Sequence, residues 1–96
     1  MDAATVTAAP DLLTGTFGDE VVILSLETGT YYGLRGVAAR IWSYLQQPIS
    51  VLALRDAILD EFDVEVPQCE ADLLSFLDDM VAKGLVSRQA IDAGAA

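Results

Sequence analysis

The sequence contains no histidine and only one cysteine, Cys69. Without an imidazole, the chain cannot build a Ser-His or Cys-His nucleophile pair, and a single thiol does not supply the ligands of a zinc site. One cysteine also excludes an internal disulfide, which is typical of proteins from a reducing compartment. We therefore expect a cytoplasmic protein that holds neither a metal ion nor another cofactor.

Catalytic motifs are missing as well. The acid pairs Asp60-Glu61 and Asp78-Asp79 are adjacent in sequence, so on a helix their side chains diverge by roughly 100° and cannot share one proton or one metal ion. Neither the dinucleotide-binding G-x-G-x-x-G pattern nor a Walker phosphate-binding loop occurs in the chain. These absences favour a binding protein over an enzyme.

Basic residues are scarce: five Lys and Arg stand against 15 Asp and Glu, which gives a net charge of −10. Between Asp56 and Asp79 the chain has nine acids and no base. A protein that binds nucleic acid must neutralise phosphates with cations, so we expect no nucleic-acid partner. Most of these carboxylates are expected on a solvated surface.

Long hydrophobic runs are also lacking. None is longer than a run such as Val21–Leu24, which is far shorter than the roughly 18 residues of a membrane helix. The N-terminal residues MDAATVTAAPD lack the basic start and apolar middle of a secretion signal. We expect no membrane association. The 96 residues are 53% hydrophobic, which is enough for one core and one domain.

Three short strands are predicted in the first half of the chain. Leu12–Phe17 ends at Gly18-Asp19, and the β-branched run Val21–Leu26 follows. The turn at Glu27–Gly29 then leads into a returning strand, Thr30–Leu34, as in a β-hairpin.

Helical periodicity begins after Gly36 and predicts three helices. The first covers Val37–Gln47 and stops at Pro48; the second, Val51–Phe62, has Ser50 as its N-cap. The third begins at Pro67 and ends at Lys83-Gly84, where a glycine allows the left-handed turn that closes many helices.

This order of elements predicts an α+β fold, winged helix-turn-helix-like, with a three-stranded antiparallel sheet followed by three helices. We expect one domain over residues 11–87, between flexible tails at 1–10 and 88–96. Val86 is expected to add a residue or two of strand. Besides a peptide-binding module, this fold leaves two alternatives open: a winged-helix DNA-binding regulator, and an acidic carrier domain with a modified serine at a helix start.

The segment Thr30–Leu34, TYYGL, is unusual for a strand at the edge of a sheet. It has no lysine or proline, the residues that commonly protect such an edge from pairing. Tyr32 shares a face with Thr30 and Leu34, and Tyr31 shares the other face with Gly33. Two interpretations remain open at this point: the tyrosines cover the core, or the edge accepts an extended peptide as an additional strand.

The segments TGTYYGL, IWSYL and FLDDMVAKGLV occur in this order over residues 20–87. In this combination the chain resembles the PqqD-like family, the precursor peptide recognition elements of ribosomally made, modified peptides (RiPPs). The resemblance implies a winged helix-turn-helix fold that binds the leader segment of a precursor peptide as a fourth strand, against the third strand and the third helix. The sequence is most similar to the freestanding members of lasso-peptide biosynthesis, which implies a transglutaminase-like cysteine leader peptidase, or another modifying enzyme, as the partner.

Carried over to this sequence, the resemblance implies a backbone ladder and a groove wall. The ladder would fall on Thr30, Tyr31, Tyr32, Gly33 and Leu34. One stripe of the third helix and its entry loop would form the wall: Val66, Cys69, Leu73 and Phe76. Buried core positions are the competing interpretation for Cys69, Leu73 and Phe76. We further expect the nearby Asp72 and Asp79 to face a cationic leader residue.

The sequence departs from the family at two positions near the strand-to-helix corner. Arg35 stands where the family often has asparagine, and Ala38 stands where it often has glycine. The unprotected edge would also allow two copies of the chain to pair as a homodimer.

Overall fold

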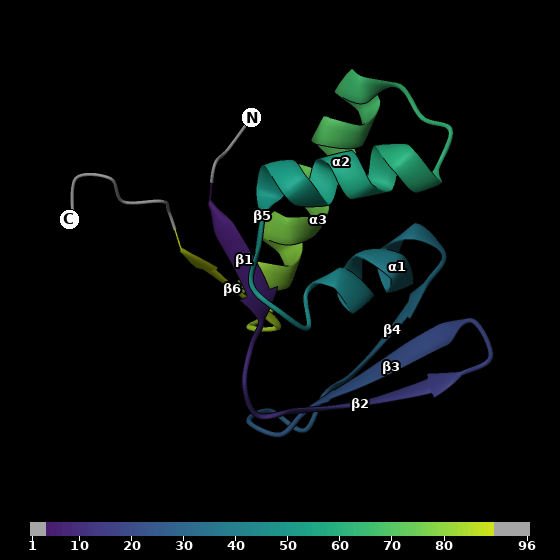
Figure 1. The fold of residues 1–96 in the computed structure, drawn as a ribbon. Helices are drawn as coiled ribbons and strands as arrows, with labels where there is room; N and C mark the ends of the chain where they lie inside the picture. The colour runs from purple at the N-terminus through teal and green to yellow at the C-terminus, as the bar shows by residue number, and fades with distance from the viewer. Residues whose placement is uncertain (1–3, 90–96) are drawn as a thin grey trace.

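In the computed structural model, residues 4–89 are described, and they form two small antiparallel sheets and three helices (Figure 1). The predicted α+β fold, with a three-stranded antiparallel sheet followed by three helices, is confirmed. The elements follow in the order β1 (Thr5–Ala8), β2 (Leu12–Phe17), β3 (Glu20–Ser25), β4 (Tyr31–Arg35), α1 (Val37–Tyr44), β5 (Ile49–Ser50), α2 (Val51–Glu61), α3 (Val66–Ala82) and β6 (Val86–Gln89).

The first sheet contains the three strands that the sequence predicts, in the order β2-β3-β4. β3 pairs with β2 on one side and with β4 on the other, with Ile23 opposite Tyr32. Between β3 and β4 the chain turns at Gly29, which has a φ of 72°, a conformation that glycine adopts without strain. β4 begins and ends one residue later than the predicted Thr30–Leu34.

A second sheet, in the order β5-β1-β6, was not predicted. Its middle strand β1 lies inside the expected N-terminal tail, and β6 extends through Arg88 and Gln89 of the expected C-terminal tail. The expectation of flexible tails is therefore wrong for Thr5–Ala8 and for these two residues. β1 is short, and its partners lie more than 40 residues away, so local periodicity could not reveal it. The rest of the C-terminal tail and residues 1–3 lie outside the described residues.

The helix ends follow from local hydrogen bonds. The side-chain oxygen of Ser50 accepts a hydrogen bond from the Ala53 N–H at 3.0 Å, which confirms it as the N-cap of α2. After α3, Gly84 has a φ of 77°, and the Leu85 N–H donates to the Met80 carbonyl at 2.9 Å. This is the hydrogen bond of a Schellman motif. α1 ends at Tyr44, three residues before the predicted end.

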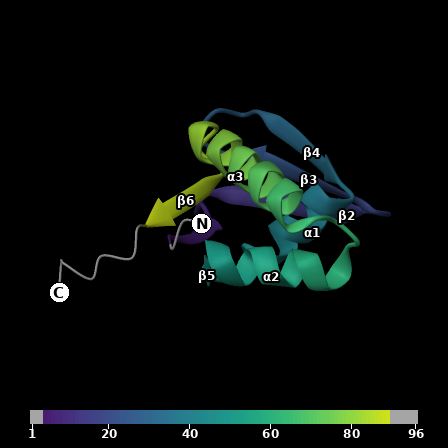
Figure 2. The same ribbon diagram turned by 90° about the horizontal axis from the view of Figure 1, so that it is seen from above.

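The core lies between the helices and one face of the β2-β3-β4 sheet (Figures 1 and 2). Ile23 is fully buried from the sheet side, and Leu45, Leu54 and Leu77 are fully buried from the helical side. Tyr32 and Leu34 of β4 are half-buried and pack against this core, whereas Tyr31 is 69% exposed. The predicted division of β4 into two faces therefore holds.

Candidate peptide-binding site

The outer edge of β4 presents backbone groups that no strand within residues 4–89 pairs with, because β4 is the last strand of its sheet. The hydrogen-bond register shows which groups these are. The Ser25 N–H donates to the Thr30 carbonyl at 2.9 Å, and in an antiparallel pair such hydrogen-bonded positions alternate. Tyr32 and Leu34 therefore direct their backbone groups toward β3.

Tyr31, Gly33 and Arg35 consequently direct their N–H and C=O groups away from β3. The other side of β3 agrees with this alternation, because the Leu26 N–H donates to the Asp11 carbonyl at 3.2 Å on the β2 side. The free backbone positions therefore belong to the residues of β4 whose side chains do not face the core. Of the predicted ladder residues, Thr30 lies before the strand, and its N–H donates to the Thr28 hydroxyl at 3.3 Å.

The C-terminal end of α3 lies near β4, and the helix runs in the opposite direction to the strand (Figure 2). Near its C-terminal end, the Lys83 ammonium lies 5.6 Å from the centroid of the Tyr32 ring. Farther back along α3, Phe76 lines a pocket together with Val37 and Ala38, which directly follow the end of β4 and its corner residue Gly36. The C-terminal end of α3 therefore lies near the beginning of β4, at Tyr32. The pocket lies near the end of β4, at Val37 and Ala38.

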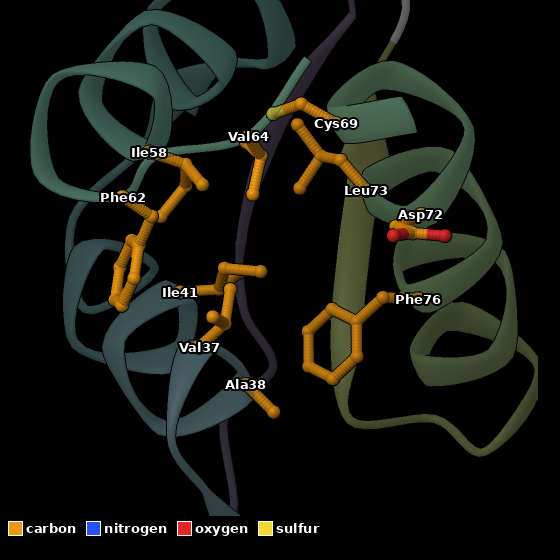
Figure 3. A pocket seen from close by; sticks show the side chains of 10 residues that line it. All are labelled: Val37, Ala38, Ile41, Ile58, Phe62, Val64, Cys69, Asp72, Leu73 and Phe76. Carbon is orange, nitrogen blue, oxygen red and sulfur yellow. The ribbon is translucent and has the colours of Figure 1, made fainter. Parts of the chain in front are cut away.

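The pocket has a volume of about 240 Å³ and lies between α1 and α2 on one side and α3 on the other (Figure 3). Figure 3 shows Phe76 directed across it toward Val37 and Ala38. Its lining is apolar except for one acid: Val37, Ala38, Ile41, Ile58, Phe62, Val64, Cys69, Asp72, Leu73 and Phe76. Small-molecule sites typically have about 300–1,000 Å³, so this pocket is better matched to one or two side chains of a peptide.

Four of the six residues predicted on α3 line the pocket: Cys69, Asp72, Leu73 and Phe76. Cys69 and Leu73 are also core residues, with 5% and 2% of their surface exposed, so the core interpretation is correct for both, and their part in a peptide groove stays a prediction. Burial is the main cause that raises the pKa of the Cys69 thiol, and the charge of Glu70 adds to it.

Val66 and Asp79 do not line the pocket. Val66 begins α3 and is 47% exposed, and Val64 of the preceding loop takes its place in the lining. The Asp79 carboxylate accepts a hydrogen bond from the Lys83 ammonium at 2.8 Å. One turn of the helix separates Asp79 from Phe76 and the pocket.

The opposite wall of the pocket was not predicted from the sequence. The missed residues come from α1, α2 and the loop after α2: Val37, Ala38, Ile41, Ile58, Phe62 and Val64. Helical spacing does place Val37 with Ile41, and Ile58 with Phe62, on one apolar face of each helix. That signal does not say whether an inner face meets another helix or an open pocket, because this depends on how the helices pack together.

Every basic side chain of the chain forms an ion pair with a carboxylate. The five bases pair as Arg35–Glu20, Arg40–Glu61, Arg55–Glu70, Lys83–Asp79 and Arg88–Asp78, with N–O distances between 2.6 and 3.4 Å, and Arg55 also pairs with Asp56 at 2.9 Å. A DNA-binding surface needs cations that are available to phosphates, and this pairing weighs against the winged-helix regulator. The carrier alternative would need a modified serine at a helix start, and Ser50 is the serine at the start of α2. Ser50 also belongs to β5, and its hydroxyl is used as the N-cap of α2.

Over residues 4–89, no group of three or more acidic, cysteine or histidine side chains is arranged to hold a metal ion. Within the same residues, none of the helices combines the length and the apolar character needed to span a membrane.

This chain is similar to two solved structures and matches one protein family. The structure titled "TbiB1 in Complex with the TbiA(beta) Leader Peptide" is 38% identical, with a TM-score of 0.80 over 84% of this chain and 94% of TbiB1. A lasso peptide synthetase B1 complexed with a leader peptide is 21% identical, with a TM-score of 0.76 over 85% of this chain and 96% of that protein, and shows the shared fold. Curated proteins gave no match. The family described as coenzyme PQQ synthesis protein D (PqqD) matches residues 20–86, and the chain therefore belongs to the PqqD family.

Proposed function

We propose that this protein binds the leader segment of a ribosomally made precursor peptide as a fourth strand on the outer edge of β4. The observation that carries the proposal is the outward direction of the backbone groups of Tyr31, Gly33 and Arg35, next to an apolar pocket. The similar protein TbiB1 is described in complex with a leader peptide, which supports the same role in this chain.

The energies of such a complex are sufficient for reversible binding. Each net ladder hydrogen bond contributes about 0.5–1.5 kcal/mol, and a fully buried Leu- or Phe-sized side chain contributes about 1.5–3 kcal/mol. Ordering a free peptide costs about 2–5 kcal/mol. The balance corresponds to a dissociation constant between micromolar and nanomolar, which suits a protein that must release its peptide.

The proposal includes a preference for a cationic residue in the leader. Asp72 is the one charged residue of the pocket lining, and the Gln68 side-chain amide donates a hydrogen bond to its carboxylate at 2.8 Å. An exposed ion pair contributes about 0–1 kcal/mol, so Asp72 would affect the choice of leader more than the affinity. Asp79 is the weaker candidate for this role because it is paired with Lys83.

The proposal extends to delivery of the bound precursor to a modifying enzyme in the cytoplasm. In this role the chain binds and presents the peptide, and a separate protein carries out the chemistry. For a lasso peptide, the partner would be a transglutaminase-like cysteine leader peptidase. The free β4 edge would also permit a homodimer in the absence of peptide.

Replacement of Gly33 tests the ladder directly. Gly33→Pro removes an outward-facing N–H, and proline is tolerated at edge strands where that N–H faces solvent. Gly33→Ala is the matched control because it adds a Cβ but keeps the N–H. In both variants the new Cβ meets the Glu20 carboxylate, 2.9 Å away, at the far end of a flexible side chain that can move aside.

The measurement is a calorimetric titration with the TbiA(beta) leader peptide, and with the leader of the cognate precursor as a second probe. We expect Gly33→Pro to weaken binding at least tenfold and Gly33→Ala to change it less than threefold. Backbone amide shifts of the wild-type protein should concentrate at β4 and the facing side of α3. Shifts confined to α2, or equal affinities of the two variants, would contradict the proposal.

A further inference from the structure

The outer face of the β2-β3-β4 sheet carries an apolar surface that the structure leaves open. Strand alternation places five side chains together on this face: Leu13, Phe17, Val22, Leu24 and Tyr31. Leu13, Phe17 and Tyr31 are 56%, 67% and 69% exposed. Among residues 4–89, all three helices lie on the opposite face of the sheet (Figures 1 and 2). We call these five residues the outer-face patch.

The composition of this patch is unusual for a sheet face in contact with water. Antiparallel sheets with one solvated face usually carry polar residues there. Here Val22 and Leu24 are half-buried and are not among the residues that pack against the core, although they belong to the central strand. Phe17 lies over Gly15, since a Cβ added to Gly15 would come within 3.2 Å of the ring. An exposed apolar cluster of this kind is a candidate interaction surface.

Charged residues stand at both ends of the patch, and most of them are acids. Asp19 and Glu20 lie at the β2-β3 turn, and Asp11 and Glu27 lie at the opposite end of the sheet. The one base in this part of the chain, Arg35, is paired with Glu20 at 3.4 Å. A partner with an apolar centre and a basic border would complement this surface.

A second copy of the chain fits the patch poorly. Each copy carries a net charge of −10, and the acids at both ends would face acids of the other copy. From strand spacing, the patch measures roughly 14 by 17 Å, whereas a stable interface buries about 800 Å² on each partner. The patch therefore suits the apolar centre of a transient complex.

β4 connects this patch to the proposed peptide site. Tyr31 contributes its side chain to the patch and directs its backbone groups toward the outer edge, where the peptide would pair. A protein bound to the outer face would therefore lie beside the added strand. We propose that the outer-face patch docks the enzyme that modifies the bound precursor, through an apolar protrusion of that enzyme flanked by Lys or Arg. This inference rests on the proposed function.

Two substitutions on β2 test the docking surface at a distance from the peptide edge. Leu13→Lys and Phe17→Lys replace exposed apolar side chains with cations, two strands away from the edge that would hold the peptide. Thr14→Lys is the matched control: it is an exposed residue of the same strand, receives the same charge and faces the other side of the sheet. Circular dichroism melting verifies that all three variants fold.

The probes are the cognate leader peptide and the purified enzyme that modifies the cognate precursor. We expect Leu13→Lys and Phe17→Lys to weaken enzyme binding and slow precursor modification at least tenfold, with leader affinity within twofold of wild type. Thr14→Lys should resemble wild type in all assays, and rising salt should weaken the wild-type complex. Unchanged enzyme binding in both patch variants would overturn the inference while leaving the peptide-binding proposal intact.

Two further results would decide against this docking surface. Sedimentation showing a wild-type dimer that Phe17→Lys makes monomeric would assign the patch to a second copy of the chain. Loss of leader affinity in the patch variants would place the patch within the peptide site. Failure of the wild-type protein to bind the leader at all would instead refute the proposed function on which the inference rests.

Discussion

The Lys83 ammonium lies 5.6 Å from the centroid of the Tyr32 ring and donates a hydrogen bond to Asp79 at 2.8 Å. This contact connects the C-terminal end of α3 to the beginning of β4, although the two residues are separated by 51 positions in sequence. A cation above an aromatic ring stabilises such a contact by about 0.5–1 kcal/mol at an exposed site. The Tyr32 ring is thereby held against the core, beside the outer edge of β4.

The two neighbouring tyrosines of β4 are expected to respond differently to truncation. Tyr32→Ala removes a half-buried ring that packs against the core and contacts Lys83, and should lower leader affinity at least tenfold while the protein still folds. Tyr31→Ala should change it less than threefold, because Tyr31 contributes its backbone to the ladder and its side chain faces solvent. Calorimetric titration measures both. Equal effects of the two substitutions would contradict this assignment of faces.

Substitutions of Phe76 test whether the pocket takes part in leader binding. Phe76→Asp places a carboxylate in an otherwise apolar wall next to Asp72, and burying an unpaired charge is strongly unfavourable. We expect leader affinity to fall at least tenfold, whereas Phe76→Leu keeps an apolar side chain and should lose less. A fluorescence anisotropy titration with a labelled leader compares them, after thermal melts have shown that both variants fold. Full affinity in Phe76→Asp would exclude this pocket from the site.

Cys69 offers a chemical probe of pocket occupancy. Its thiol is buried, and burial raises its pKa, so little reactive thiolate is present at pH 8. We expect alkylation by iodoacetamide to be at least tenfold slower than in the denatured protein, and slower still when a saturating leader peptide fills the pocket. Mass spectrometry follows the adduct over time. A rate that the bound leader leaves unchanged would argue against occupation of the pocket.

The hydrogen bonds between α1 and Glu61 of α2 should make the stability of the fold depend on pH. The Tyr44 hydroxyl and the Arg40 guanidinium both donate hydrogen bonds to Glu61, and these bonds lower the pKa of its carboxyl below the ordinary 4.5. Because the folded pKa lies below the unfolded one, this stabilisation is complete above about pH 4.5 and is lost as the pH falls through the folded pKa.

Glu61→Gln should therefore be less stable than wild type at pH 7, and the difference should shrink as the pH is lowered toward 3. Urea denaturation at a series of pH values measures it. Asp60→Asn is a suitable control, because it neutralises a neighbouring acid of α2 that forms no ion pair within the described residues. A constant difference between wild type and Glu61→Gln over this range would show that the Glu61 contacts do not titrate as described.

Local sequence patterns were sufficient to predict most of the helices and strands. The hairpin of β3 and β4, the N-cap at Ser50 and the Schellman motif at Gly84 depend on residues within a few positions of one another. For the same reason, strand alternation predicted that Tyr32 and Tyr31 lie on opposite faces of β4, but the packing of the helices decided which face meets the core. Small errors at the ends of β4 and α1 reflect interactions with neighbouring elements that compete with local preference.

The sequence by itself determined the α+β class, the absence of histidine chemistry, the acidic charge and the uncharged segment TYYGL. Only the tertiary structure decided which backbone groups of β4 remain unpaired, which residues form the second wall of the pocket, and that β1 joins β5 and β6. These features depend on residues tens of positions apart coming together: Thr5 pairs with Gln89, and Phe76 lines the same pocket as Ala38. Periodicity identifies the face that each element buries, but the packing of the whole chain determines what that face meets.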